Sequence, residues 1–178
     1  MTILVCPLSR VSEVVAARAP ERVVSVLDPE FAFPQLGGAY DGRHLQLRFH
    51  DIHVPTEGQT LPTHDHAREL IAFLDGWTRA GPMLVHCRAG IGRSTATAFI
   101  AACRRNPHTS EFAIARALRA ASSNARPNET LVALADAVMK RDGRMHRAIA
   151  ETGRGLPWIE VYENEPFEMP SRFPPDGA

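Results

Sequence analysis

The chain has 178 residues, of which 44% are hydrophobic, and this is enough for one domain with a single buried core. Its 20 basic and 20 acidic residues cancel, so no broad positive field attracts nucleic acid or a membrane surface, and we expect neither as a partner. The apolar run Ile3–Leu8 is too short for a signal peptide or a membrane span. Cys6, Cys87 and Cys103 are odd in number and far apart, which indicates reduced thiols and a cytoplasmic protein.

Strands and helices alternate in the first half of the chain, and helices follow alone in the second half. Hydrophobic periodicity predicts, in chain order, a strand over 2–7, a helix over 11–18, strands over 22–28 and 44–49, a helix from 64 to about 78, a strand over 82–85, and helices over 93–105, 110–121 and 128–140, with 144–151 as a continuation of the last. Thr63 is a suitable N-cap for the helix that follows it. We therefore predict an α/β fold in which a small central sheet is flanked by helices.

The segment His86–Ser94 separates an apolar strand from an Ala-rich helix and holds the most informative pattern of the chain. A loop between the carboxyl end of a strand and the amino end of a helix carries backbone N–H groups without helical partners, and these form an anion site with the helix dipole. Gly90 and Gly92 permit the tight curl that such a loop needs. We expect the following residues to bind a phosphate group: Arg88, Ala89, Gly90, Ile91, Gly92 and Arg93.

Four side chains of this segment are candidates for the chemistry on that phosphate. Five residues separate Cys87 from Arg93, which is long enough to circle one phosphate and bring both side chains to it. Arg93 is expected to bind the phosphate oxygens with two charge-assisted hydrogen bonds. Cys87, on the floor of an electropositive bowl, is expected to be a thiolate that attacks the phosphorus atom. Ser94 would donate a hydrogen bond to the sulfur as it leaves, and His86 would orient the loop from behind.

The pattern His-Cys-x5-Arg-Ser between such a strand and helix resembles the signature of the cysteine-dependent protein tyrosine phosphatases. The chain length is similar to that of their compact, dual-specificity-like branch, and the resemblance covers residues 1 to about 141. It implies hydrolysis of phosphate monoesters, phosphotyrosine in proteins or a dual specificity, through a cysteinyl-phosphate intermediate and without a cofactor. Because Arg provides nineteen of the basic residues and Lys one, we expect a bacterial protein from a GC-rich genome.

A phosphatase of this kind needs a general acid, because the leaving group must be protonated as the phosphorus–oxygen bond breaks. Asp51 follows the strand over 44–49 and therefore lies at the same sheet edge as Cys87. Its spacing upstream of the cysteine also resembles the place of the family's acid, although the Trp-Pro-Asp motif of other members is absent. Asp65, near the start of the next helix, is the second candidate, and a carboxylate there also stabilises the helix dipole.

The segment 153–178 differs from the rest, with five prolines and no helical period. It carries several large apolar residues, too many for a solvated linker: Trp158, Ile159, Val161, Tyr162, Phe167, Met169 and Phe173. We expect a phosphatase catalytic domain over 1–152 and a Pro-rich tail over 153–178 that packs on it in extended form. A contact with a partner or a second copy is the alternative. Nothing in the tail suggests catalysis.

Several histidines near the candidate acid invite a metal site: His50, His53, His64 and His66. Helical metal ligands are usually three or four residues apart, whereas His64 and His66 are two apart, so we expect no metal. Solvated histidines at the rim of the active site are the simpler interpretation. Arg126 and Asn128 belong to a turn before a helix. A similar loop lies at the active-site mouth in the resembling family, and an N-cap role for Asn128 is an equal alternative.

Other function classes compete with a phosphatase. A rhodanese-like sulfurtransferase or an arsenate reductase also uses a loop cysteine, but the first usually lacks this signature and the second needs further cysteines nearby. A non-catalytic module that binds phosphate or a phosphoprotein is the stronger alternative, although such modules tend to lose the cysteine or the acid, and Cys87 and Asp51 are both present. A small phosphorylated metabolite such as an inositol phosphate is a further substrate class. It is weakened because the loop adds only Arg88 to Arg93 and has no Lys.

Overall fold

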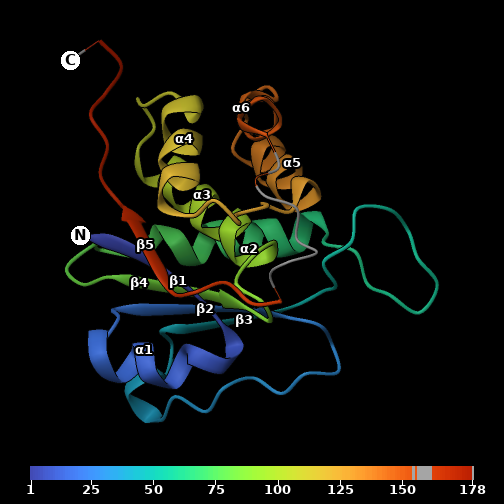
Figure 1. The fold of residues 1–178 in the computed structure, drawn as a ribbon, viewed down its shortest axis with the longest axis vertical. Coiled ribbons are helices and arrows are strands. Elements are labelled where there is room, and N and C mark those ends of the chain that lie inside the picture. Colours follow the sequence, from blue (N-terminus) through green and yellow to red (C-terminus); the bar gives the residue numbers. More distant parts are fainter. Residues whose placement is uncertain (154, 156–161, 178) are drawn as a thin grey trace.

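A central sheet with helices on both faces organises the chain (Figure 1). The structure is a computed structural model that describes residues 1–153, 155 and 162–177. Its strands are β1 (Thr2–Pro7), β2 (Arg22–Leu27), β3 (His44–Arg48), β4 (Met83–Cys87) and β5 (Phe167–Pro170). Their order in the sheet is β3-β2-β4-β1-β5; the first four are parallel, and β5 is antiparallel to β1. Parallel strands end at one sheet edge, so the segments after β2, β3 and β4 meet there.

The helices divide unequally between the two faces of the sheet. They are α1 (Val11–Arg18), α2 (His64–Asp75), α3 (Arg93–Arg105), α4 (Glu111–Ala121), α5 (Glu129–Val138) and α6 (Arg144–Thr152). Helix α1 covers one face and the other helices cover the opposite face (Figure 1). None of these helices is long and apolar enough to cross a membrane.

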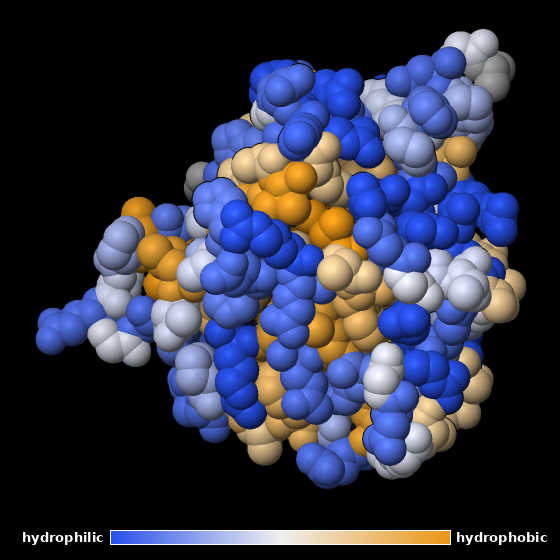
Figure 2. Space-filling view, turned by 180° about the vertical axis from the view of Figure 1, so that it is seen from behind, coloured by the Kyte–Doolittle hydropathy of each residue, from blue (hydrophilic) through white to orange (hydrophobic). Residues whose placement is uncertain are grey.

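The sheet separates two hydrophobic clusters. The smaller one joins α1 to the sheet through Leu4, Cys6, Val11, Val14, Val23 and Leu84. The larger one lies under α2 to α6 and contains the largest buried side chains, Trp77, Phe49 and Phe99. Helix α3 lies at its centre, and Arg93 to Cys103 are all buried. Seen from the opposite side, the surface is mostly hydrophilic, with hydrophobic side chains visible between polar ones (Figure 2).

The predicted α/β class is confirmed, and most predicted elements lie within a few residues of their expected bounds. Thr63 caps α2, as predicted, and Ala67, Leu70, Ile71 and Leu74 face the core. The prediction that residues 144–151 continue the helix over 128–140 was wrong. Lys140, Asp142 and Gly143 all have positive φ angles, and they separate α5 from α6.

The C-terminal tail provides a strand that the sequence did not predict. Phe167 and Met169 belong to β5, which pairs with β1 over Thr2 to Val5. The tail residues Trp158, Ile159 and Val161, expected to pack on the core, lie outside the described residues.

Candidate active site

The loop between β4 and α3 turns its carbonyl groups outward. Each carbonyl from Arg88 to Gly92 accepts a hydrogen bond from outside the loop. The donors are Leu8 N–H for Arg88 (3.1 Å), Asn164 N–H for Ala89 (2.8 Å), Asn164 Nδ2 for Gly90 (3.3 Å), Arg126 N–H for Ile91 (3.0 Å) and Asn128 N–H for Gly92 (3.3 Å). In a trans peptide the carbonyl and the next N–H point in opposite directions, so the following N–H groups face the inside of the loop. This backbone can bind an anion.

Both glycines of the loop are required, for different reasons. Gly90 has a φ of +73°, which side-chain-bearing residues rarely adopt, and a Cβ there would lie 3.0 Å from the nitrogen of Pro7. Gly92 has an ordinary φ, but a Cβ there would overlap the carboxylate of Asp51. The absence of a side chain at Gly92 therefore lets Asp51 approach the loop.

Cys87 ends β4 below this loop and is only 2% exposed. Its Sγ lies 3.2 Å from the Oγ of Ser94, on the first turn of α3, so the hydroxyl can donate to a sulfur anion. His86 is completely buried, and its Nε2 lies 2.5 Å from the Oγ of Ser25, which also bonds to His44. Burial lowers the pKa of His86 to about 4, so this ring is neutral near pH 7 and supports the strand end from behind.

Arg93 is held by two partners that leave one edge of its guanidinium available. Nη1 donates to Asp28 Oδ1 (2.9 Å) and to the carbonyl oxygen of Phe49 (2.6 Å), while Nη2 donates to Asp28 Oδ2 (3.1 Å). Nε is buried and has no partner in the described part of the chain. The Nε–H and the second Nη2 hydrogen share one edge of the group, and together they form a fork with two donors for an anion.

Asp28 is a residue of the site that the sequence patterns did not predict. It follows β2 directly and is 9% exposed, at the sheet edge where β3 and β4 also end. An acidic residue at the end of a buried parallel strand is the signal that could have identified it.

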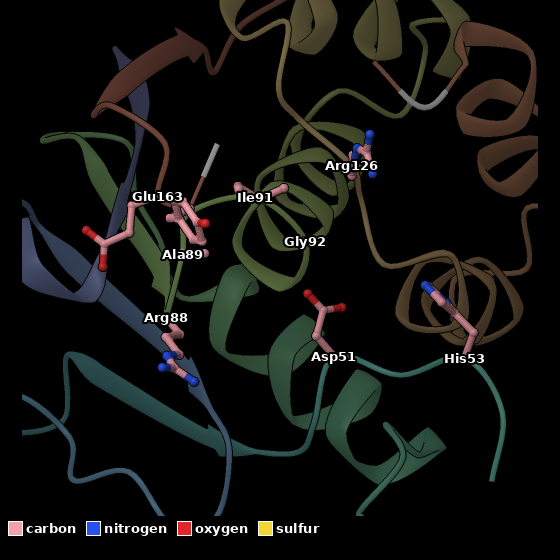
Figure 3. Close-up of a pocket in the computed structure, with 9 residues that line it drawn as sticks. Asp51, His53, Arg88, Ala89, Ile91, Gly92, Arg126 and Glu163 are labelled. Atoms are coloured by element: carbon pink, nitrogen blue, oxygen red, sulfur yellow. The ribbon is translucent and has the colours of Figure 1, made fainter. Parts of the chain in front are cut away.

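Asp51 approaches the loop from the segment after β3. Figure 3 shows its carboxylate directed toward Gly92 and the interior of the cleft. Its Oδ1 accepts a hydrogen bond from Nδ2 of Asn128 (2.7 Å), whose own Oδ1 caps α5 by accepting from Leu131 N–H (2.8 Å). The predicted N-cap role of Asn128 is confirmed, and the same residue also orients the carboxylate.

Asp65, the second candidate for the acid, lies elsewhere. It is exposed on the first turn of α2 and accepts a hydrogen bond from Nη1 of Arg68 at 2.7 Å. It does not line the cleft over the loop. The structure therefore brings Asp51, but not Asp65, to the phosphate loop, residues 86–94.

A cleft of about 680 Å³ opens above the loop (Figure 3). Its lining residues come from four separate segments: Asp51, His53, Arg88, Ala89, Ile91, Gly92, Arg126, Tyr162 and Glu163. The Arg88 guanidinium lies over the ring of Phe31, 4.8 Å from its centroid. Tyr162 and Glu163 belong to the tail, in which the sequence suggested no role at the site.

The histidines do not converge. His66 completes a capping box, since its Nδ1 accepts from Thr63 N–H (3.1 Å), and His50 Nδ1 accepts from Thr60 N–H (2.8 Å). His53 lies at the cleft. In the described ranges, no group of three or more His, Cys, Asp or Glu side chains could hold a metal ion.

The other two cysteines are in surroundings that disfavour a thiolate. Burial raises the pKa of Cys6 to about 12 and raises the pKa of Cys103 well above its usual range. Neither has a disulfide partner. Cys87 is the cysteine that lies beneath the anion-binding backbone.

Comparison with known proteins agrees with this geometry. A family model described as protein-tyrosine phosphatase matches residues 46–130, which include Asp51 and the whole phosphate loop. No curated protein sequence matches the chain.

Solved structures share the fold at low sequence identity. Human DUSP28 is 21% identical, with a TM-score of 0.54 over 75% of this chain and 85% of its own. A human tyrosine phosphatase-like serine/threonine/tyrosine-interacting protein is 18% identical, with a TM-score of 0.56 over 76% and 89%. PTPMT1, solved in complex with PI(5)P, is 18% identical, with a TM-score of 0.55 over 79% and 94%. The protein-tyrosine phosphatase match over residues 46–130 therefore supports a cysteine-dependent phosphatase, and the chain has the fold of the compact dual-specificity enzymes.

Proposed function

We propose that this phosphatase removes phosphate from phosphotyrosine in proteins through a cysteinyl-phosphate intermediate. The observation that carries the proposal is the position of the Cys87 sulfur beneath a loop whose carbonyls all point outward. A thiolate there is stabilised by inward N–H groups and faces a bound phosphorus atom. The three free cysteines also support a reducing compartment, the cytoplasm.

The reaction divides into two steps. In the first, the Cys87 sulfur attacks phosphorus while Asp51 gives its proton to the leaving oxygen, and the substrate departs as a free phenol. The loop N–H groups and the open edge of Arg93 bind the three equatorial oxygens as their charge develops. In the second step water attacks the phosphorus atom and Asp51 takes its proton. The sulfur then leaves as a thiolate, with the Ser94 hydroxyl as hydrogen-bond donor.

Hydrolysis of p-nitrophenyl phosphate with and without vanadate tests this proposal. We expect turnover that vanadate abolishes, and we expect Cys87→Ser to bind vanadate or a phosphopeptide without turnover. Binding without turnover by the wild type would instead favour a non-catalytic phosphoprotein-binding module. Transfer of sulfur from thiosulfate to cyanide would favour a sulfurtransferase.

A small phosphorylated metabolite is the second candidate substrate. Arg88, Arg126 and His53 all line the cleft, and basic groups around a phosphate loop suit ligands with several phosphates. The structural neighbour PTPMT1 was solved in complex with PI(5)P, a ligand of this kind. Comparing kcat/KM for a phosphotyrosine peptide, a phosphoserine peptide and an inositol phosphate decides among these classes.

A further inference from the structure

Asn164, in the C-terminal tail, reaches the centre of the phosphate loop. Its side chain and backbone are buried, with 7% exposure. Its N–H donates to the carbonyl of Ala89 (2.8 Å) and its Nδ2 donates to the carbonyl of Gly90 (3.3 Å). The family match ends at residue 130, so this contact comes from a part of the chain outside it.

Two further hydrogen bonds fix the orientation of Asn164. Its Nδ2 also donates to Oγ of Ser122 (2.9 Å), and its Oδ1 accepts from Nδ2 of Asn124 (3.4 Å). On the loop side the Cβ of Asn164 lies 3.4 Å from where a Cβ on Gly90 would stand. Because the Gly90 carbonyl can only accept a hydrogen bond, the side-chain nitrogen of Asn164 must face it, and not the side-chain oxygen.

These hydrogen bonds determine which backbone groups face the phosphate. When the carbonyls of Ala89 and Gly90 point outward, the N–H groups of Gly90 and Ile91 point inward, because trans peptides place the two groups on opposite sides. Gly90 has a φ of +73°, and glycine adopts several backbone conformations at similar energy. The loop therefore needs an outside contact to keep this peptide from turning its carbonyl toward the anion.

We propose that Asn164 is a positioning residue of the phosphatase, which holds the inward N–H groups of Gly90 and Ile91 in place. This inference rests on the proposed function. It extends the catalytic unit beyond residue 152 into the tail, with Asn164 acting through the loop and not on the substrate itself.

The variant Asn164→Ala tests the proposal in the full chain. We expect kcat for p-nitrophenyl phosphate to fall about tenfold with a smaller change in KM, because the loop binds the transition state more tightly than the ground state. Vanadate should inhibit more weakly by a similar factor. The pH midpoint of Cys87 alkylation by iodoacetamide, followed by peptide mapping, should move to higher pH, since fewer N–H groups stabilise the sulfur anion.

Two further variants separate the hydrogen bond from packing. Asn164→Asp keeps the size but presents an oxygen to the Gly90 carbonyl, so we expect a larger loss than with Asn164→Ala. Glu165→Gln changes the adjacent tail residue, which is exposed and pairs with Arg10 at 3.2 Å, and should leave kcat and the alkylation midpoint unchanged. Thermal unfolding confirms that each variant is folded.

Unchanged kcat, vanadate inhibition and alkylation midpoint in folded Asn164→Ala would overturn the role of Asn164. An equal loss in Glu165→Gln would also overturn it, since tail packing in general would then be responsible. If the wild type has no hydrolase activity, the proposed function fails. Asn164 is then judged by the alkylation midpoint alone: a shift supports its role and no shift refutes it.

Discussion

The phosphate loop, residues 86–94, and the described tail, residues 162–177, both contribute to one cleft, but the sequence encodes them in different ways. The loop presents nucleophile, anion-binding backbone and arginine within consecutive residues, so its chemistry is readable locally. The tail reaches the same place through Asn164, which contacts a residue 74 positions earlier. The nucleophile and the phosphate-binding arginine are thus local in sequence, while the groups that hold them are distant. Substitutions in the first class should cause larger losses than substitutions in the second.

The largest loss is expected for Cys87→Ser. A serine hydroxyl is a far poorer nucleophile than a thiolate at neutral pH, so kcat for p-nitrophenyl phosphate should fall at least about 1,000-fold. The backbone of the loop remains, and the dissociation constant for a phosphopeptide should change little. Residual activity within tenfold of wild type would show that another group attacks phosphorus.

The second largest loss of activity is expected for Arg93→Lys. An ammonium retains the charge beside Asp28 but cannot present the Nε and Nη2 edge, so kcat should fall about 100- to 1,000-fold. Measuring kcat and KM separately checks this, because the loss should lie mainly in kcat. An unchanged kcat would remove Arg93 from the mechanism and would break the link between the local motif and the chemistry.

His86 belongs to the loop segment yet should act on stability. Burial lowers its pKa from 6.5 to about 4. Between pH 4 and pH 6.5, His86 is therefore protonated in the unfolded chain and neutral in the folded chain. The neutral ring therefore stabilises the fold fully above pH 6.5, and this contribution, about 3 kcal/mol, is lost as the pH falls toward 4.

Urea unfolding at pH 7 and at pH 4 measures this contribution. The wild type should lose about 3 kcal/mol more than His86→Gln over this range. The Ser25 hydroxyl also bonds to His44, and burial lowers the pKa of His44 as well. The variant His44→Gln therefore measures how much of the pH-dependent loss of stability comes from His44. An equal loss of unfolding free energy from pH 7 to pH 4 in wild type and His86→Gln would contradict a lowered pKa of His86 as its cause.

Asp51→Ala tests the acid, which lies outside the loop but meets the substrate. Hydrolysis of phosphotyrosine should slow about 100-fold, because its phenolate leaves poorly without a proton, while an aryl phosphate with an acidic phenol should slow much less. The basic limb of the pH–rate profile should also disappear. The matched variant Asp65→Ala should resemble wild type on both substrates. The reverse pattern would transfer the role to Asp65.

Local sequence predicted the elements and the loop because their determinants are close together along the chain. The cap at Thr63, the core face of α2 and the curl at Gly90 each depend on a few neighbouring residues. Long-range contacts have no such local determinant: Asp28 meets Arg93 across 65 positions, and β5 pairs with β1 from the other end of the chain. No periodicity marks such contacts before the chain is folded, and their energies depend on burial that the fold creates.

Asp28→Asn should give the smallest of these effects and tests a distant positioning group directly. The amide keeps the shape of the carboxylate but loses its charge and one acceptor, so Arg93 is held mainly by the carbonyl of Phe49. We expect kcat to fall about tenfold, with KM less affected, because the open edge of the guanidinium is then less well aligned. Glu30→Gln, two residues further along and exposed, is the matched control and should change neither constant. A loss for Asp28→Asn as large as that for Arg93→Lys would mean that the arginine has no function without its distant partner, and the division between reacting and holding groups would fail.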